Sequence, residues 1–361
     1  MKTLIAAVSA LCPLLAAAAD EDLASQARAI GAPLSSAGAL FATLDRQDGL
    51  VVRAPGQGSL VYVSPGRLAV EQQGRGGVVL GAGTGSMSAN FFGLSATGLA
   101  PPGINGEGKF NAPYFAMVHD ARHAGVSMAA WEGGRLRLGV LVEGRDMAEV
   151  LPTLTPFARR GLLSAEFEQH VGPLVAIASV GVMREKGVLL GSLQGGALTV
   201  TAPTRTNFAS LSLGYALSPR FSLVGMASAG RTSAYNNAEG LAGQFAPVNT
   251  VAYSIGLSAR QLFEASDRFG LTLTVPTRVT QNGFNVAGAI LQREDGSLSY
   301  ATRALNFSPS AVERDLEMTY SRKIGQQGRL SGALMLRTNP GHEAGTPRDL
   351  LLGIRYSRSF R

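Results

Sequence analysis

The sequence predicts an all-β protein, an antiparallel transmembrane β-barrel of about 12–14 strands with a short N-terminal helix or linker, preceded by a signal peptide. Three observations lead to this fold class. The chain starts with a secretory signal, most of its length alternates apolar residues with small or polar ones, and short turns alternate with long connections.

Residues 1–19 have the three parts of a secretory signal peptide. Lys2 gives the positive start, Leu4 to Leu15 form the apolar stretch, and Ala17 to Ala19 provide a small-residue cleavage site. The apolar part is too short to span a bilayer as a helix. The only cysteine, Cys12, follows Leu11 rather than a small residue, so we expect a Sec-type signal and no lipid anchor. The mature chain would then contain no thiol for a disulfide or a metal site.

The composition fits a barrel better than a soluble domain. Charged residues make up 16% of the chain and glycine contributes 45 residues, whereas soluble domains carry about 25% charged residues. After the signal there is no apolar run of about 18 residues, so membrane-spanning helices are not expected. The net charge of +7 comes mostly from scattered arginines without a basic-aromatic patch, which argues against nucleic-acid binding.

Alternation with a period of two residues indicates strands from about residue 112 onward. The clearest example sets Val251, Tyr253, Ile255, Leu257 and Ala259 against Ala252, Ser254, Gly256, Ser258 and Arg260. The second face is mainly Ser, Gly, Thr and Ala, unlike the charged outer face of a soluble sheet. We therefore assign residues 111–361 to the barrel domain, with about fourteen strands, or about twelve if residues 112–131 do not span the membrane.

The connections indicate which end of the barrel is which. Short turns at residues 218–219, 265–267 and 325–328 alternate with longer links at 231–249, 308–313 and 339–348. Outer-membrane barrels have short periplasmic turns and long outer loops. The dipeptide Asn282-Gly283 suits a type I′ hairpin turn. Residues 20–110 form a Gly-rich N-terminal region in which residues 20–48 have helical character, and this helix is a candidate plug for the lumen.

The two strand faces then receive different roles. If the apolar face contacts lipid, the other face points into the lumen, and the predicted lumen-facing residues are Arg135, Arg137, Arg260, Arg268, Arg337 and Arg355. The alternating C-terminal run predicts an assembly signal formed by Leu352, Ile354, Tyr356 and Phe360. The expected partners are outer-membrane lipid and the barrel-assembly machinery, and we expect a monomer.

Several segments recur together in one known family. They are Asn111 to Met117, Gly181 to Ser192, Ala304 to Ser310, Arg314 to Arg322, Asn339 to His342 and Gly353 to Phe360, preceded by Leu44-Asp45-Arg46. With them the chain resembles the C-terminal translocator β-barrel of proteobacterial autotransporters, of the type that follows subtilisin-like serine peptidase passengers. The resemblance implies a barrel in the outer membrane of a Gram-negative bacterium. The chain departs from the family in having almost no passenger, and in placing Arg361 after Phe360.

We find no catalytic centre, cofactor site or metal site in the sequence. The run from Gly83 to Asn90 is similar to the motif around a subtilisin-type serine, here Ser86, but no histidine precedes it to act as the base. His119 and His123 have the spacing of a metal pair on a helix, yet they lie in an expected turn without a third ligand. The leading prediction is a pore-like or structural outer-membrane barrel. The alternatives are a secreted soluble β-rich binding module, a remnant of a subtilisin-like peptidase, and a barrel hydrolase.

Overall fold

The computed structural model shows a chain built almost entirely of antiparallel strands. The predicted all-β class is confirmed. The structure describes residues 50–53, 59–64, 67–73, 78–84, 92–94, 109–118, 122–143, 159–186, 190, 203–236, 242–281, 283–292, 298–306, 308–325 and 328–358. The candidate helix at 20–48, Ser86, His119 and Phe360 lie outside these residues.

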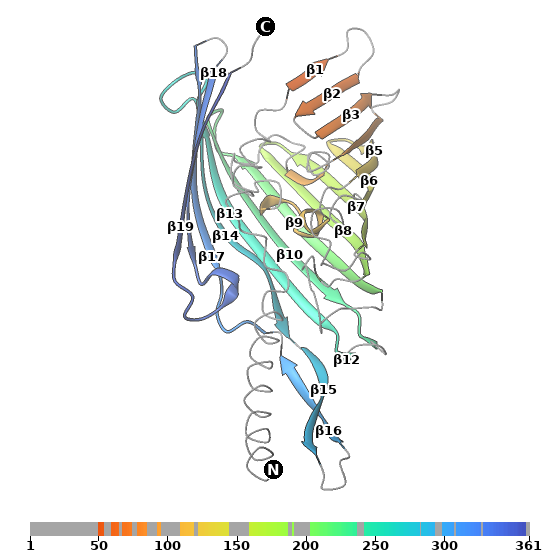
Figure 1. Ribbon diagram of the computed structural model, residues 1–361. Coiled ribbons are helices and arrows are strands. Elements are labelled where there is room, and N and C mark those ends of the chain that lie inside the picture. The colour runs from red at the N-terminus through yellow and green to blue at the C-terminus, as the bar shows by residue number, and fades with distance from the viewer. Residues whose placement is uncertain are drawn as a thin grey trace.

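The main sheet has fifteen strands among the described residues, and Figure 1 shows that it curves around a concave side. The strands follow one another in chain order apart from two interruptions, after β10 and after β14. The end strands are β1 and β19, and no pairing between them is found in the described part of the chain. The bounds are β1 Leu50–Arg53, β2 Ser59–Ser64, β3 Arg67–Gln73, β4 Val79–Thr84, β5 Arg122–Trp131, β6 Gly134–Val142, β7 Arg159–Val171, β8 Leu174–Lys186, β9 Thr204–Ala216, β10 Phe221–Thr232, β13 Val248–Arg260, β14 Arg268–Gln281, β17 Arg314–Ile324, β18 Gly328–Thr338 and β19 Asp349–Arg358.

Strand length divides the main sheet into two parts. The eleven strands from β5 onward have 9 to 14 residues, whereas β1 to β4 have 4 to 7. A tilted strand needs about 9–11 residues to cross a bilayer. The sheet thus begins at Leu50, before the expected start of the barrel at residue 111, but its strands of membrane-crossing length all come after that position. Within the described ranges, no helix is long and apolar enough to cross a membrane.

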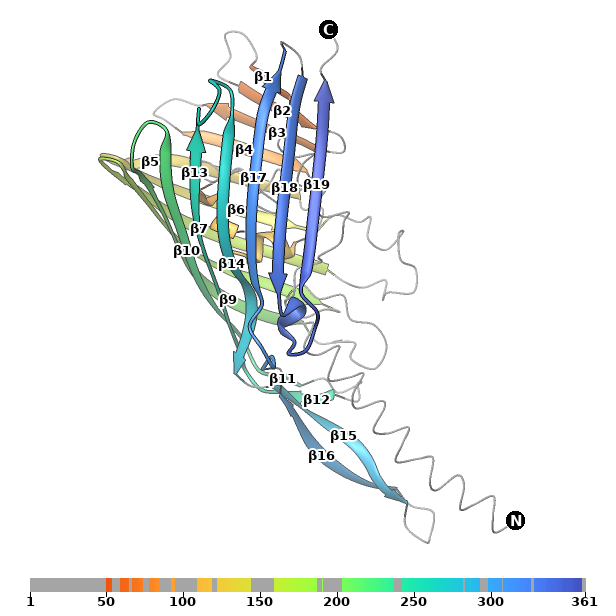
Figure 2. The ribbon, with the colours of Figure 1, turned by 90° about the vertical axis from the view of Figure 1, so that its left-hand side faces the viewer.

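Short and long connections alternate along the eleven longer strands. Short turns follow β5, β7, β9, β13 and β17, and longer links follow β6, β8, β10, β14 and β18. Because neighbouring strands are antiparallel, all the short turns lie at one end of the sheet, which is also the end that β19 runs toward (Figure 2). The alternation expected from the sequence is therefore present.

A second, smaller sheet is formed by strands in two of the long links, the one after β10 and the one after β14. It contains β11 (Tyr235–Asn236), β12 (Ala242–Phe245), β15 (Gly283–Gln292) and β16 (Leu298–Asn306), and β12 pairs with β15. Figure 2 shows β15 and β16 extending beyond the long-loop end of the main sheet. The hairpin predicted at Asn282-Gly283 is wrong, because β14 pairs with β13 and β17 whereas β15 pairs with β12 and β16. The chain passes from the main sheet to the smaller one between Gln281, the end of β14, and Gly283, the start of β15.

The two faces of the main sheet have the reverse of a soluble protein's polarity. Large apolar side chains are exposed on alternate positions of most strands, among them Leu138, Val140, Leu163, Phe167, Leu211, Leu213, Tyr253, Ile255, Leu271, Leu273, Leu316 and Met318. The buried positions between them carry polar groups such as Ser164, Ser179, Thr206, Ser210, Ser212, Ser254, Thr272, Thr319 and Ser331. The faces predicted from the alternation are those observed.

Candidate functional site on the concave face

Two short stretches of chain lie against the concave face of the main sheet (Figure 1). They are residues 92–94 and 109–118, which we call the interior segment. The second stretch contains α4 (Tyr114–Met117), a helix of four residues preceded by Pro113. The amide of Asn111 donates a 3.2 Å hydrogen bond to the backbone carbonyl of Phe92 and so joins the two stretches. The sequence places residues 92–94 and 109–110 in the Gly-rich N-terminal region and gives no sign of this arrangement.

Aromatic rings pack the interior segment against the sheet. The rings of Phe92 and Phe115 stack with centroids 4.9 Å apart, and those of Tyr114 and Phe208 stack at 4.4 Å. Phe115 also meets Phe208 edge-on at 6.2 Å. Because Phe208 belongs to β9, this cluster fixes the segment to the wall of the sheet.

Two glycines leave room for these rings. A Cβ atom at Gly139 of β6 would lie 2.1 Å from Cζ of Phe92, and a Cβ atom at Gly181 of β8 would lie 2.4 Å from Cζ of Phe208. Neither contact is possible without movement of a ring. The concave face is therefore shaped to accept these aromatic side chains.

Apolar side chains cover a patch of the otherwise polar concave face. Leu94 and Phe110 of the interior segment form a buried cluster with Val175, Ile177, Val224, Met226 and Ala252. The hydroxyl of Ser212 donates a 2.7 Å hydrogen bond to the backbone carbonyl of Phe110. Apolar groups here would face water in an open lumen, and the interior segment covers them.

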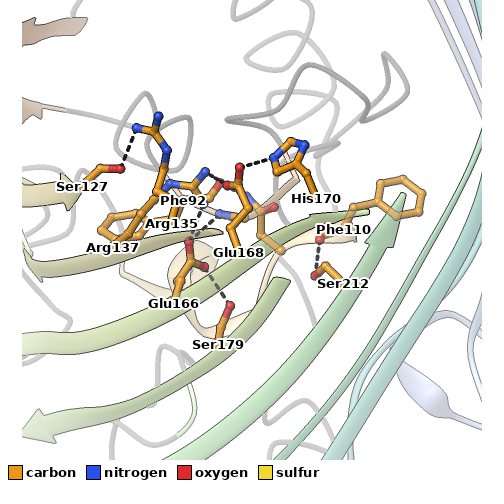
Figure 3. Close-up of polar contacts among 12 residues, drawn as sticks. Phe92, Phe110, Ser127, Arg135, Arg137, Glu166, Glu168, His170, Ser179 and Ser212 are labelled. Atoms are coloured by element: carbon orange, nitrogen blue, oxygen red, sulfur yellow. Dashed lines mark hydrogen bonds and ion pairs between the residues drawn. The ribbon is translucent and has the colours of Figure 1, made fainter. Parts of the chain in front are cut away.

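A buried charge network holds the first stretch of the interior segment, and Figure 3 shows its contacts. Glu166 of β7 accepts hydrogen bonds from the backbone N–H of Gly93 at 2.8 Å, from the hydroxyl of Ser179 at 2.8 Å and from the Arg137 guanidinium at 3.3 Å. Arg137 also pairs with Glu168, which contacts a ring nitrogen of His170 at 2.5 Å. The side chain of Glu166 is 0% exposed, so its charge depends on these donors.

A second buried charge cluster lies toward the long-loop ends of β7 and β8. The Arg160 guanidinium contacts Glu143 at 2.5 Å and Glu185 at 3.4 Å. Glu185 also accepts a 2.8 Å hydrogen bond from the backbone N–H of Leu190. The charges on this wall therefore occur mainly as acid–base pairs.

On the β17 wall, three acidic residues alternate along one face. Glu313, Asp315 and Glu317 are all buried, and we call them the acidic ladder. The Lys109 ammonium of the interior segment pairs with Glu317 and lies 3.4 Å from the Thr272 hydroxyl. The interior segment is thus held on two walls, at Glu166 on β7 and at Glu317 on β17.

The link between β18 and β19 folds back onto the sheet next to the ladder. Nδ1 of the buried His342 accepts a 2.9 Å hydrogen bond from the backbone N–H of Glu313, and Nε2 donates to the carbonyl of Thr277 at 3.2 Å. Burial lowers the pKa of His342 to about 4, with a smaller contribution from the nearby Arg278 cation. Asn339 and His342 both have positive φ, of 52° and 60°, which gives this link a sharply turned backbone.

The predicted lumen-facing arginines occupy different positions. Arg137 and Arg337 are buried and paired with carboxylates, Arg135 and Arg355 are half-buried, and Arg260 and Arg268 are exposed and opposite each other next to a short turn. All six fall on the alternating positions of the polar face. Arg135 donates a 3.1 Å hydrogen bond to the Ser127 hydroxyl. A role in lining a pore remains a prediction.

The proposed assembly-signal residues lie on the opposite face. Leu352, Ile354 and Tyr356 of β19 are 66%, 66% and 55% exposed.

His123, expected in a solvated turn, is instead buried in β5, so that interpretation is wrong. The described residues contain no group of histidine, cysteine, aspartate and glutamate suited to a metal ion.

No protein-family model and no curated protein matches the chain. Among solved structures, it is similar to a high-pH structure of OprB of Pseudomonas putida, with 13% identity and a TM-score of 0.44 over 81% of this chain and 72% of that one. It is also similar to OmpT of Vibrio cholerae, with 10% identity and a TM-score of 0.44 over 84% of each chain. A third is an anion-selective porin from Comamonas acidovorans, with 14% identity and a TM-score of 0.38 over 80% of this chain and 76% of that one. At these values the likeness assigns neither a family nor a function, and the autotransporter resemblance is not confirmed.

Proposed function

We propose that this chain is an outer-membrane β-barrel protein whose lumen is closed by the interior segment. The observation that carries the proposal is the reversed polarity of the main sheet. Its exposed face presents rows of Leu, Val, Ile, Phe and Tyr, while its concave face carries hydroxyl groups and paired charges. Lipid is the environment in which that outer face is stable, because large exposed apolar patches drive a protein toward a membrane or another apolar surface.

The strand lengths and connections agree with this placement. The eleven longer strands match the thickness of a bilayer, and their short turns and long links lie at opposite ends. A sheet in lipid can leave no backbone edge unpaired. The proposal therefore requires that the edges of β1 and β19 be covered in the membrane.

The finer assignment is a barrel of the autotransporter translocator type without a long passenger. It rests on the sequence segments shared with that family, of which Asn111 to Met117 forms much of the interior segment. A secreted binding module would need its apolar residues inside, opposite to the arrangement seen. The expected partners remain outer-membrane lipid and the barrel-assembly machinery, with the protein acting as a monomer.

Fractionation and gel mobility test the proposal. The protein should sediment with outer membranes, and unboiled samples should migrate differently from boiled ones, because a closed barrel resists detergent. In planar bilayers the intact protein should conduct little and a variant with a weakened interior segment should conduct more. A fully soluble pool without a mobility shift would refute the barrel, and unchanged conductance in every such variant would refute the closing role of the segment.

A further inference from the structure

Four cationic side chains gather on the apolar face of the main sheet, at its long-loop end. We call them the cationic patch, and they are Arg184 and Lys186 of β8, Arg205 of β9 and Arg231 of β10. All four are exposed, and they occupy the same alternating positions as Val180, Leu211 and Leu223 of these strands. Each is one of the three residues of its strand nearest the end beyond which β15 and β16 extend (Figure 2).

Two arginines of the patch lie directly opposite each other. The register of β8 and β9 pairs Arg184 with Arg205, and neighbouring strands are about 5 Å apart. Like charges at directly opposite positions on one face of a sheet repel each other and destabilise the pairing. Arg231 lies opposite Asn207, which is two positions after Arg205 on the same face. The strands therefore bring three guanidinium groups together, and an anion between them would remove their repulsion.

The charge of the patch is not balanced by neighbouring acids. Within the part of the chain that the structure describes, none of the four cations forms an ion pair, and their side-chain contact is a 3.2 Å hydrogen bond from Nε of Arg205 to Oδ1 of Asn207. Glu185, whose two neighbours in the chain belong to the patch, is buried on the concave face. At the short-turn end of the apolar face, by contrast, Arg322 has an acidic partner in Glu264 at 2.8 Å.

Apolar surface continues from the patch along the same strands. Toward the short turns, β9 and β10 expose Leu211, Leu213 and Leu223. Between these side chains and the patch the exposed positions include the small residues Ala209 and Ala229. Cations at the rim of the sheet with apolar surface below them match an amphiphile that has an anionic headgroup and acyl chains. The position also fits the membrane, because a charged side chain on the lipid face is tolerated near the interface and not at the midplane.

We propose that the cationic patch binds the phosphate groups of an anionic lipid in the outer leaflet of the membrane. The inference rests on the proposed function, because the long loops of an outer-membrane barrel lie on its outer side. Guanidinium groups present N–H donors in a planar fork that binds phosphate oxygens in pairs. A phosphate between Arg184 and Arg205 contacts both groups and removes their repulsion, and Arg231 adds a third guanidinium from the next strand. The acyl chains of the same lipid then lie along Leu211 and Leu213.

Titration of the folded, detergent-solubilised full chain with diphosphoryl lipid A, followed by native mass spectrometry, tests the site. The unaltered protein should bind this lipid roughly tenfold or more tightly than the dephosphorylated lipid, because hydrogen bonds to a charged group are among the stronger ones. Arg184→Gln combined with Arg205→Gln should remove that preference. Inorganic phosphate in excess should displace little of the lipid, since it has no acyl chains to contact the apolar face.

Arg314→Gln combined with Arg348→Gln is the matched control. Arg314 begins β17 and Arg348 directly precedes β19, so both lie at the long-loop end of the sheet, and both are exposed. The strand β18 lies between them, so they are not directly opposite each other. The control removes the same amount of charge as the first variant and should bind both lipids like the unaltered protein.

Equal weakening in the two double variants would overturn the proposal, because it would indicate general charge attraction. Equal binding of the two lipids by the unaltered protein would also overturn it, and this comparison decides if the Arg184 and Arg205 variant does not fold. Complete displacement by inorganic phosphate would show a free-anion site and exclude the lipid. A missing mobility shift on boiling of the unaltered protein would count against the proposed function, whereas a shift without phosphate preference would count against the patch alone.

Discussion

The Glu166 carboxylate accepts a 2.8 Å hydrogen bond from the backbone N–H of Gly93, which lies 73 residues earlier in the chain. This contact joins the wall of the sheet to the interior segment through the backbone of Gly93 and needs no side chain from the segment. The same carboxylate also accepts hydrogen bonds from Ser179 and Arg137, so residues of the sheet itself hold the acceptor in position. The stability of the closed state, in which the interior segment is bound to the sheet, should therefore depend on Glu166.

Glu166→Ala should release the first stretch of the interior segment. A hydrogen bond to a charged group contributes about 1.5–3 kcal/mol, so the open fraction should rise roughly tenfold or more. The measurement is the rate of protease cleavage within residues 92–118, alongside boiled and unboiled gel mobility to confirm a folded barrel. Glu132→Ala alters an exposed turn residue of the same charge and should leave cleavage unchanged. A cleavage rate equal to that of the control would contradict the role of Glu166.

Gly139→Val should displace Phe92 without preventing insertion of the barrel. The added side chain would begin 2.1 Å from the Phe92 ring, so the ring and the segment must move away. Gly225→Ala is the control, because a Cβ atom there has only one neighbour, at 3.7 Å. Protease sensitivity of the segment should increase in the first variant alone. Equal protection of both variants would show that Phe92 does not need the space at Gly139.

The faces of the strands were predictable from the sequence, whereas the interior segment was not. Alternation such as that from Val251 to Arg260 is a local signal, because one residue in two must face lipid wherever a strand crosses the membrane. The contacts of Gly93 with Glu166 and of Lys109 with Glu317 join residues 73 and 208 positions apart, and no local pattern encodes them. The aromatic content of Asn111 to Met117 was visible, but only the folded sheet shows that Gly139 and Gly181 receive rings.

Acidification should loosen the link that contains His342. The pKa of this histidine is about 4 in the closed link and close to 6.5 when the link is released. The released form therefore binds more protons between these values, so the stability of the closed link falls as the pH drops from about 6.5 to about 4, by roughly 3 kcal/mol in total. Above pH 6.5 the histidine contributes no pH dependence.

His342→Gln isolates this contribution. Burial raises the pKa of the neighbouring Glu313, which changes stability in the opposite sense, so only a comparison of variants is informative. Glutamine keeps a donor and an acceptor but does not titrate. Hydrogen exchange of the Glu313 amide, corrected for its intrinsic pH dependence, should accelerate more between pH 7 and pH 5 in the unaltered protein than in the variant. Identical pH profiles would rule out His342 as the titrating group.

Ile354→Arg should reduce the amount of protein in the outer membrane. Ile354 is 66% exposed on the apolar face of β19, and an arginine near the membrane midplane costs about 2–4 kcal/mol. Ile354→Val keeps the apolar surface and should assemble normally. Quantification of the heat-modifiable band in membrane fractions measures the difference. Equal membrane levels of the two variants would argue against contact between this face and lipid.

The charge preference of the opened lumen follows from which arginines have acidic partners. In the closed protein Arg137 is balanced by Glu166 and Glu168, while Arg135 contacts the uncharged Ser127. Glu166→Ala opens the segment and also removes one of these acids, so two guanidinium groups, those of Arg135 and Arg137, are left in this network with the one carboxylate of Glu168. Since arginine stays protonated at any relevant pH, the excess is permanent.

We expect the Glu166→Ala pore to prefer anions, measured as the reversal potential across a potassium chloride gradient. Adding Arg135→Glu and Arg137→Glu should reverse the sign of that potential, whereas adding Arg322→Gln, which alters an arginine paired with Glu264 next to a short turn, should not. Cation preference in Glu166→Ala itself would mean that the acidic ladder, and not these arginines, sets the potential inside the lumen.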